Sequence, residues 1–153
     1  MKELKIRTAT IEDLVILKQF EQGIVKAERP YDETLDQDPI SYYDLKELIK
    51  SDNAEVVVAS SHNEIIGSGY INIVNAKPYL KFTRYGHLGF MFTKPEFRGK
   101  GINKMIMEKL IAWGKTKNLV EVRLNVYSDN QSAIKAYQKT GFEKLMINMR
   151  LEI

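Results

Sequence analysis

The sequence feature that most constrains this chain is the glycine-rich segment Arg98-Gly99-Lys100-Gly101-Ile102-Asn103. It directly follows the apolar stretch 88–93 and directly precedes a helical pattern that begins at Lys104. Glycines let a backbone adopt positive φ and approach a ligand closely, and the first N–H groups of a helix carry the positive end of its dipole. A strand, a glycine turn and a helix start in this order indicate an anion site, for which phosphate or pyrophosphate is the natural ligand.

Two well-known phosphate-binding motifs fit this segment poorly. A nucleotide-triphosphatase loop ends in Gly-Lys followed by Ser or Thr, whereas Lys100 is followed by Gly101. A dinucleotide-binding fingerprint places three glycines at the first strand of a repeated βαβ unit, and this segment lies far along the chain. For two glycines taken alone, a simple turn between a strand and a helix is an equally good interpretation.

Composition narrows the class of protein. A chain of 153 residues with 44% hydrophobic content predicts a single domain, 1–153, that buries roughly two-thirds of its unfolded surface. The net charge of +3 comes from interspersed acids and bases, which argues against a nucleic-acid partner. With no cysteine, and with His62 and His87 not spaced as ligands, we expect no metal. No segment has the apolar length of a membrane span or a secretory leader, so we predict a soluble, cytoplasmic protein without a membrane partner.

The hydrophobic pattern is that of a mixed α/β chain. Strict alternation of apolar and polar residues is clearest in 120–127 and recurs in 145–153. Residues 26–39 are rich in proline and acidic side chains and are expected to form a loop. The expected strands are 4–8, 55–59, 65–74, 86–93, 120–127 and 145–153, and the expected helices are 10–24, 41–50, 102–115 and 131–139.

A second motif lies in the last predicted helix. Asn130, Ala133 and Tyr137 stand at i, i+3 and i+7, and therefore share one helical face. The small Ala133 allows close approach to that face, and the two other side chains offer polar groups on either side of it. For Tyr137 alone, an amphipathic tyrosine of the core is the simpler interpretation.

Together the two motifs resemble the signature of the GNAT superfamily of N-acetyltransferases, Arg/Gln-x-x-Gly-x-Gly/Ala followed by an Asn-x-x-Ala-x-x-x-Tyr helix. The resemblance covers roughly residues 85–142. It implies a GNAT fold of α/β (α+β) class: a central mixed, largely antiparallel sheet flanked by helices, with two central strands that splay apart. It also implies that acetyl-CoA is the co-substrate and enters between those strands.

The resemblance assigns residues to the cofactor by position. The glycine turn would hold the pyrophosphate of coenzyme A, the preceding strand would pair with the pantetheine arm, and Asn130 would contact the cofactor. Tyr137 would also protonate the departing thiolate. The cofactor-binding residues implied are Met91, Phe92, Thr93, Arg98, Gly99, Lys100, Gly101, Ile102, Asn103, Asn130 and Tyr137.

The sequence departs from the family pattern in two ways. Asn103 stands where the motif ends in Gly or Ala, and the strand 86–93 lacks the glutamate that some relatives use as a base. Conversion of a protonated amine to its nucleophilic form at pH 7 costs roughly 4–5 kcal/mol of free energy, so its proton needs an acceptor. His87 is a candidate catalytic base. Glu28 and Asp32, in the region that forms the acceptor wall of GNAT folds, are candidate substrate-binding residues, with surface charge as the simpler interpretation.

The expected function is transfer of acetyl from acetyl-CoA to an amine of a small molecule or peptide, by direct attack in a ternary complex. A backbone N–H near Met91 would stabilise the oxyanion. The alternative is an acyl-CoA-binding module of GNAT fold with little or no catalysis, which the two departures favour. Many GNAT proteins dimerise, so the resemblance also suggests a homodimer.

Overall fold

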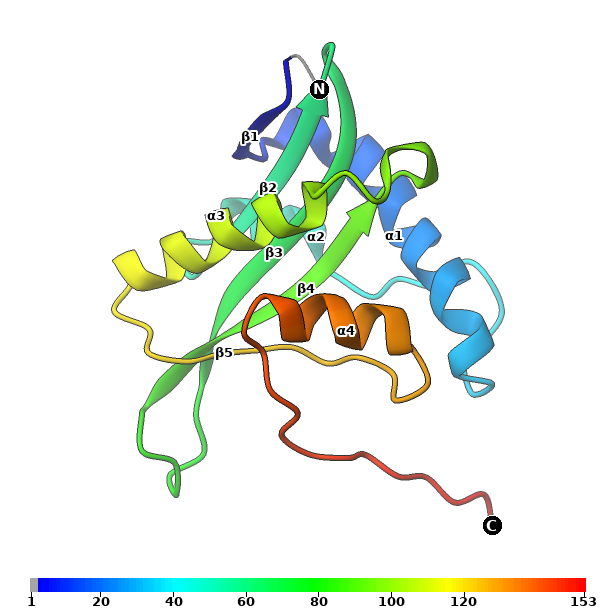
Figure 1. Cartoon of the computed structure of the whole chain (residues 1–153), viewed down its shortest axis with the longest axis vertical. Coiled ribbons are helices and arrows are strands. Elements are labelled where there is room, and N and C mark those ends of the chain that lie inside the picture. Colours follow the sequence, from blue (N-terminus) through cyan, green and yellow to red (C-terminus); the bar gives the residue numbers. More distant parts are fainter. Residues whose placement is uncertain (1–2) are drawn as a thin grey trace.

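The computed structural model describes residues 3–153, which form a five-stranded sheet in the order β1-β2-β3-β4-β5 with helices on its two faces (Figure 1). Neighbouring strands from β1 to β4 are antiparallel, and β5 runs parallel to β4. The mixed, largely antiparallel sheet expected from the sequence is therefore confirmed. The strands are β1 (Lys5–Thr8), β2 (Ala54–Ser61), β3 (Glu64–Asn75), β4 (Arg84–Thr93) and β5 (Val122–Arg123).

The helices divide between the two faces. α1 (Leu14–Glu28) and α2 (Leu45–Lys50) pack on one face, and α3 (Ile102–Thr116) packs on the other. α4 (Gln131–Lys139) lies on the α3 side, because Tyr137 packs against the same apolar cluster as α3. Within residues 3–153, no helix is both long and apolar enough to cross a membrane.

The sequence of β2 explains why both faces are covered. Val57 and Ala59 point into the cluster beneath α3, and Val56 and Val58 point into the cluster beneath α1 and α2. An unbroken apolar run is typical of a strand that is buried on both sides. The central strands therefore form a rigid platform for the elements that carry the polar motifs.

An irregularity in β4 shapes the sheet where the two sequence motifs meet. Phe90 and Met91 both lie opposite Gly69, because the register shifts between Ser68 and Tyr70. Phe90 adopts a φ of 58°, which is uncommon for a residue with a side chain, and its carbonyl accepts a hydrogen bond of 3.2 Å from the Ser68 hydroxyl. Such a bulge bends the strand and leaves a residue out of the ladder.

The last two predicted strands differ from the structure. Of the predicted strand 120–127, only Val122–Arg123 pairs with β4, and the predicted strand 145–153 is wrong, because no strand is formed there. Alternation of apolar residues predicts which side chains share a face, but a strand also needs a neighbouring edge to pair with. The splay of β4 and β5 that the family resemblance implied is present, since their pairing stops after His87 and Arg123.

Candidate cofactor cleft

A cleft of about 360 Å³ opens where β4 and the residues after β5 diverge. The edge of β4 forms one wall, residues 125–127 form the opposite wall, and the start of α3, the inner face of α4 and the end of α1 close the rest. Both sequence motifs therefore line one space. The lining residues are Ile24, Ala27, Glu28, Met91, Phe92, Thr93, Phe97, Arg98, Gly99, Gly101, Ile102, Asn103, Asn125, Val126, Tyr127, Asn130, Ala133 and Tyr137.

The glycine turn is open towards this cleft. Gly99 and Gly101 have φ values of 74° and 77°, and a Cβ added at either position would meet no atom within 4 Å. Gly101 is the N-cap of α3 and has no side chain to bond the first N–H groups of the helix. These N–H groups and the helix dipole are therefore available to an anion.

Two polar side-chain atoms of the cleft wall are buried without a hydrogen-bond partner. They are the Thr93 hydroxyl oxygen at the end of β4 and the Asn103 amide oxygen in the first turn of α3. An unpartnered buried polar group costs about 1–3 kcal/mol, which favours a ligand with polar groups at this position. These two atoms fit a ligand with polar groups along this wall, and the open glycine turn with its free N–H groups fits phosphate at the α3 end; coenzyme A is an extended ligand with both features.

Asn130 and Tyr137 hold different positions on α4. The Asn130 side chain caps the helix by accepting a hydrogen bond of 3.3 Å from the Ala133 N–H, so its oxygen already has a structural task. The Tyr137 ring packs edge-on against the Phe142 ring, with ring centres 5.9 Å apart, and Tyr137 lines the cleft. Burial, with the negative charge of Glu28, raises the pKa of Tyr137. Its hydroxyl therefore stays protonated at neutral pH and can act as a donor.

The end of α1 brings an acidic and aromatic wall to the cleft. Glu28 lines the cleft, and burial raises the pKa of its carboxyl, with the charge of Asp32 adding to the rise and the nearby Tyr42 hydroxyl opposing it. Burial, together with Glu28, also raises the pKa of Tyr42 to about 12. A carboxylate with a raised pKa is a stronger base than an exposed one.

Asp32 lies outside the cleft lining and serves to position Tyr127. Its carboxylate accepts two hydrogen bonds from Thr34 and one of 3.0 Å from the Tyr127 hydroxyl, and these bonds hold the pKa of Asp32 below its usual value. Tyr127 also stacks on Tyr31, with ring centres 6.1 Å apart. Tyr127 was not among the site residues expected from the sequence, although its place on the polar face of 120–127 could have indicated it.

His87 and Lys100 do not line the cleft. His87 lies where β4 pairs with β5, opposite Arg123, and its ring centre is 6.2 Å from that of Tyr70. Burial lowers the pKa of His87. The Lys100 ammonium lies 5.2 Å from the centre of the Phe97 ring. The structure thus brings to one cleft all the other residues that the resemblance assigned to the cofactor, together with Glu28, which was expected to bind substrate, but not His87.

Comparison with known proteins agrees with this geometry. The sequence profile of the acetyltransferase (GNAT) family matches residues 10–142. An uncharacterized N-acetyltransferase of Methanocaldococcus jannaschii is 37% identical over 54 residues, which are 35% of this chain and only 24% of that protein.

Solved structures share the fold over nearly the whole chain. A predicted acetyltransferase of Clostridium acetobutylicum, solved with acetyl-CoA, has a TM-score of 0.76 at 19% identity, covering 97% of this chain and 96% of its own. The aminoglycoside N-acetyltransferase AAC(6')-Iy, solved with a bisubstrate analogue of CoA, has a TM-score of 0.72 at 19% identity. This match covers 99% of this chain and 100% of that chain.

Proposed function

Because the chain belongs to the acetyltransferase (GNAT) family, we propose that it transfers the acetyl group of acetyl-CoA to an amine of a small molecule or peptide. One observation carries this proposal: the open glycine turn of α3, the edge of β4 and Tyr137 of α4 line one cleft, and Glu28 closes it from α1. The acetyl donor and an amine can therefore be held against each other in a ternary complex, within a single GNAT domain.

The chain offers separate groups to the two ends of the cofactor. Gly99, Gly101 and the first N–H groups of α3 would bind the pyrophosphate, with the Asn103 amide beside them. The backbone of Met91 to Thr93 would pair with the pantetheine arm as an added strand does. When bound, coenzyme A supplies the reactive acetyl thioester.

The proposed acid and the proposed oxyanion donor would come from different walls of the cleft, α4 and β4. The bulge at Phe90 and Met91 interrupts the ladder of β4, so a backbone N–H at or next to Met91 can donate to the oxygen that gains charge during attack. Tyr137 faces this wall from α4 and would protonate the sulfur as it leaves. Its raised pKa keeps the proton on the hydroxyl until the thiolate forms.

Glu28 is the group of this chain best placed to receive the amine. Its carboxylate would attract a protonated amine, and its raised pKa favours acceptance of the proton, directly or through a water. The neighbouring rings of Tyr127 and Tyr31 add aromatic faces that attract cations. A cationic amine therefore suits this wall better than an acidic acceptor. The aminoglycoside acceptor named for AAC(6')-Iy is an amine of this kind.

A matched pair of glycine variants tests the cofactor site. Gly101 and Gly141 both have positive φ and open space at the Cβ position, but only Gly101 lines the cleft. A side chain strains the backbone at both positions, so the pair controls for strain, and aspartate adds a negative charge. We expect Gly101→Asp to weaken acetyl-CoA binding in calorimetry at least tenfold, or about 1.4 kcal/mol, and Gly141→Asp to leave it unchanged. Equal affinities in the two variants would contradict the assignment.

A thiol-release assay over a panel of amines then tests the transfer itself. The alternative function is an acyl-CoA-binding module with little catalysis, which Asn103 favours because it occupies the position of a Gly or Ala in the family motif. Such a module would bind acetyl-CoA and release no thiol with any amine. Release with a cationic amine supports the transferase, and the Tyr137→Phe variant should then release thiol much more slowly.

A further inference from the structure

The connection between β3 and β4 is a hairpin that projects from the rest of the sheet (Figure 1). Its two arms are joined by a hydrogen bond of 2.8 Å from the Ala76 N–H to the Thr83 carbonyl. At its base, the Arg84 guanidinium donates to the Lys117 carbonyl at 2.8 Å. The hairpin is therefore held against the end of α3.

This part of the molecule concentrates positive charge. Residues 76–84 and 114–120 contain no acidic side chain, and within residues 3–153 none of their cations forms an ion pair. Glu121, which follows the second segment, is bonded to Arg123 at 2.7 Å and does not neutralise them. Five unpaired positive charges meet here, more than the net charge of +3 of the whole chain. They are carried by Lys77, Lys81, Arg84, Lys115 and Lys117.

A hollow of about 330 Å³, which we call the basic hollow, lies between residues 81–84 and 118–120. Lys81 and Arg84 bring cations to its wall, and Asn118 adds a neutral hydrogen-bonding group. The last carbonyls of a helix repel anions, but the Arg84 guanidinium covers the carbonyl of Lys117 and keeps further N–H groups for a ligand. This set of donors suits a phosphate.

An aromatic side chain lines the same hollow. Phe82 is half-buried there, and its ring centre is 6.3 Å from that of Tyr85. The Arg123 guanidinium lies 5.7 Å from the centre of the Phe82 ring. Aromatic rings and arginine planes stack on nucleobases, whereas lysine and arginine side chains bind the phosphates between them. The basic hollow therefore combines the two kinds of group that bind a single strand.

We propose that the basic hollow binds a single-stranded nucleic acid, with phosphates on Lys81 and Arg84 and a base against Phe82. The interspersed charges of the sequence argue against such a partner, but the fold brings together cations that are 33 residues apart, as Arg84 and Lys117 are. An acidic polypeptide would use the cations and leave the ring without a stacking partner. An anionic membrane presents a flat surface, which would leave the hollow empty.

The basic hollow is separate from the cofactor cleft, because the two lie at opposite ends of β4. Seven residues lead from Arg84 to Met91 in the cleft wall, which at about 3.3 Å per residue is roughly 23 Å. Nucleic acid and acetyl-CoA would therefore bind to different groups and at the same time. The proposal does not rest on the transferase activity.

Fluorescence anisotropy of a labelled oligouridine RNA of about 15 nucleotides tests the binding. We expect a micromolar Kd at about 50 mM salt. If four phosphates are neutralised, the log–log salt slope is about −2.8, so the affinity should fall about 50-fold by about 200 mM salt. No rise in anisotropy at low salt, or an affinity that does not depend on salt, would overturn the proposal.

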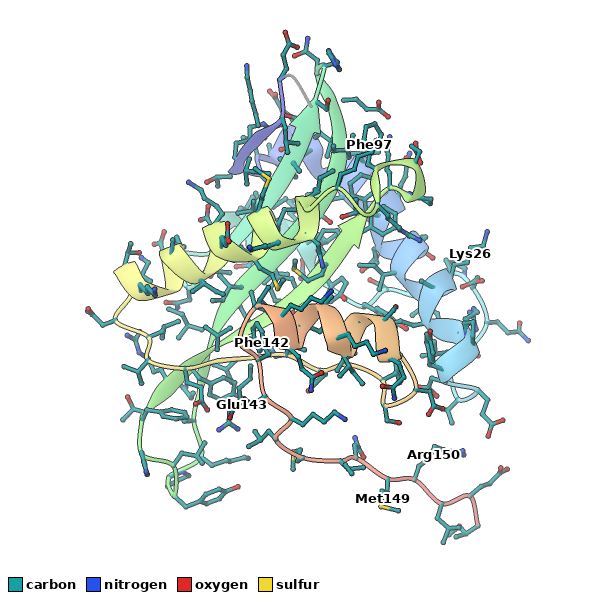
Figure 2. The ribbon with its side chains drawn as sticks, viewed as in Figure 1. Lys26, Phe97, Phe142, Glu143, Met149 and Arg150 are labelled. Carbon is teal, nitrogen blue, oxygen red and sulfur yellow. The ribbon has the colours of Figure 1, made fainter. Side chains whose placement is uncertain are left out.

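Two matched charge reversals locate the site. Lys81→Glu changes an exposed side chain of the basic hollow, and Lys26→Glu makes the same change at an exposed position on α1, far from the hairpin (Figure 2). We expect Lys81→Glu to weaken RNA binding at least tenfold and to reduce the salt slope by about 0.7, and Lys26→Glu to leave both unchanged. Equal losses in the two variants would mean that overall charge attracts the RNA, and would overturn the proposed site.

Competition separates a nucleic acid from other anions and from the cofactor. Unlabelled oligouridine should displace the probe more strongly than poly-glutamate at equal charge, and Phe82→Leu should weaken RNA binding at least fivefold without changing the salt slope. Equal competition by poly-glutamate would assign the hollow to acidic polypeptides and overturn the proposal. Saturating acetyl-CoA should leave the RNA affinity unchanged. Displacement by acetyl-CoA would place the RNA in the cofactor cleft, which would also overturn the proposal and leave the proposed transferase activity untouched.

Discussion

The two ends of the sheet are built from similarly apolar sequence, but one end is paired and buried and the other is left in solvent. From β1 to β4, every strand has a paired neighbour and the central strands are buried on both faces, as at Val57 and Ile71. At β5 and in residues 143–153, the C-terminal segment, similar alternation leaves Val120 and Ile147 in solvent. The cleft lies on the boundary between these regions, because β5 turns away from β4 after two paired residues. An ordered platform on one side and a diverging edge on the other create the site.

The largest expected difference between the two regions is in stability. Leu110 of α3 is fully buried in the cluster that joins α3 to the sheet, so Leu110→Ala should lower the free energy of unfolding by about 2–5 kcal/mol. The matched truncation Ile147→Ala removes an exposed side chain and should change it by less than about 0.5 kcal/mol in dilute protein. Urea denaturation measures both. Equal losses would show that the C-terminal segment packs as a core element within one chain.

The same contrast explains how much could be predicted from the sequence. The apolar run of β2, the glycine turn and the Asn130-to-Tyr137 face all depend on local spacing, so the sequence predicted their local structure, and the family resemblance implied that the two motifs converge on one cleft. The extent of β5 could not be predicted, because it depends on whether another strand covers its edge. The position of Glu28 could not be predicted either, because Glu28 and Tyr127 are far apart in the sequence and come together at the cleft only after the chain folds. Judged by its ordinary pKa alone, His87 was the more obvious base.

The next largest effect is expected on turnover. Tyr137→Phe removes one hydroxyl from the cleft and leaves the ring against Phe142, so the fold should be retained. We expect kcat to fall about 10²-fold, or about 2.7 kcal/mol, with little change in acetyl-CoA affinity. Tyr79→Phe, at a ring that is 82% exposed, is the control and should leave kcat unchanged. An unaltered kcat in Tyr137→Phe would remove the proposed acid.

Glu28 should determine the acid limb of the pH profile. Burial raises the pKa of its carboxyl above the ordinary value of 4.5, and a base must be deprotonated to act. The kcat/KM should therefore rise as pH increases through this raised pKa. Glu28→Gln should lower kcat/KM about tenfold at pH 7 and abolish that limb, because solvent water remains a weaker acceptor in an open cleft. A limb that persists in Glu28→Gln would assign it to another group.

The smallest expected effects on the free energy of unfolding come from two arginine–carboxylate pairs, one in each region. Arg7 binds Asp13 through two bonds of 2.8 and 2.9 Å, and Asp13 also accepts from the Thr10 N–H, whereas Arg150 and Glu33 share one exposed bond of 3.0 Å. Asp13→Asn should therefore lower the free energy of unfolding by about 1–2 kcal/mol at pH 7. Glu33→Gln should lower it by between about 0 and 1 kcal/mol.

The pH dependence distinguishes the two pairs further. The hydrogen bonds from Arg7 lower the pKa of Asp13 in the folded protein, so its stabilisation is complete above the ordinary carboxyl value of 3.8 and is lost as pH falls through the lowered value. The gap in unfolding free energy between the unaltered protein and Asp13→Asn should therefore close in acid, measured by urea denaturation at several pH values. A gap that stays constant in acid would mean that the Asp13 side chain acts through its shape and its bond to Thr10, and not through its charge.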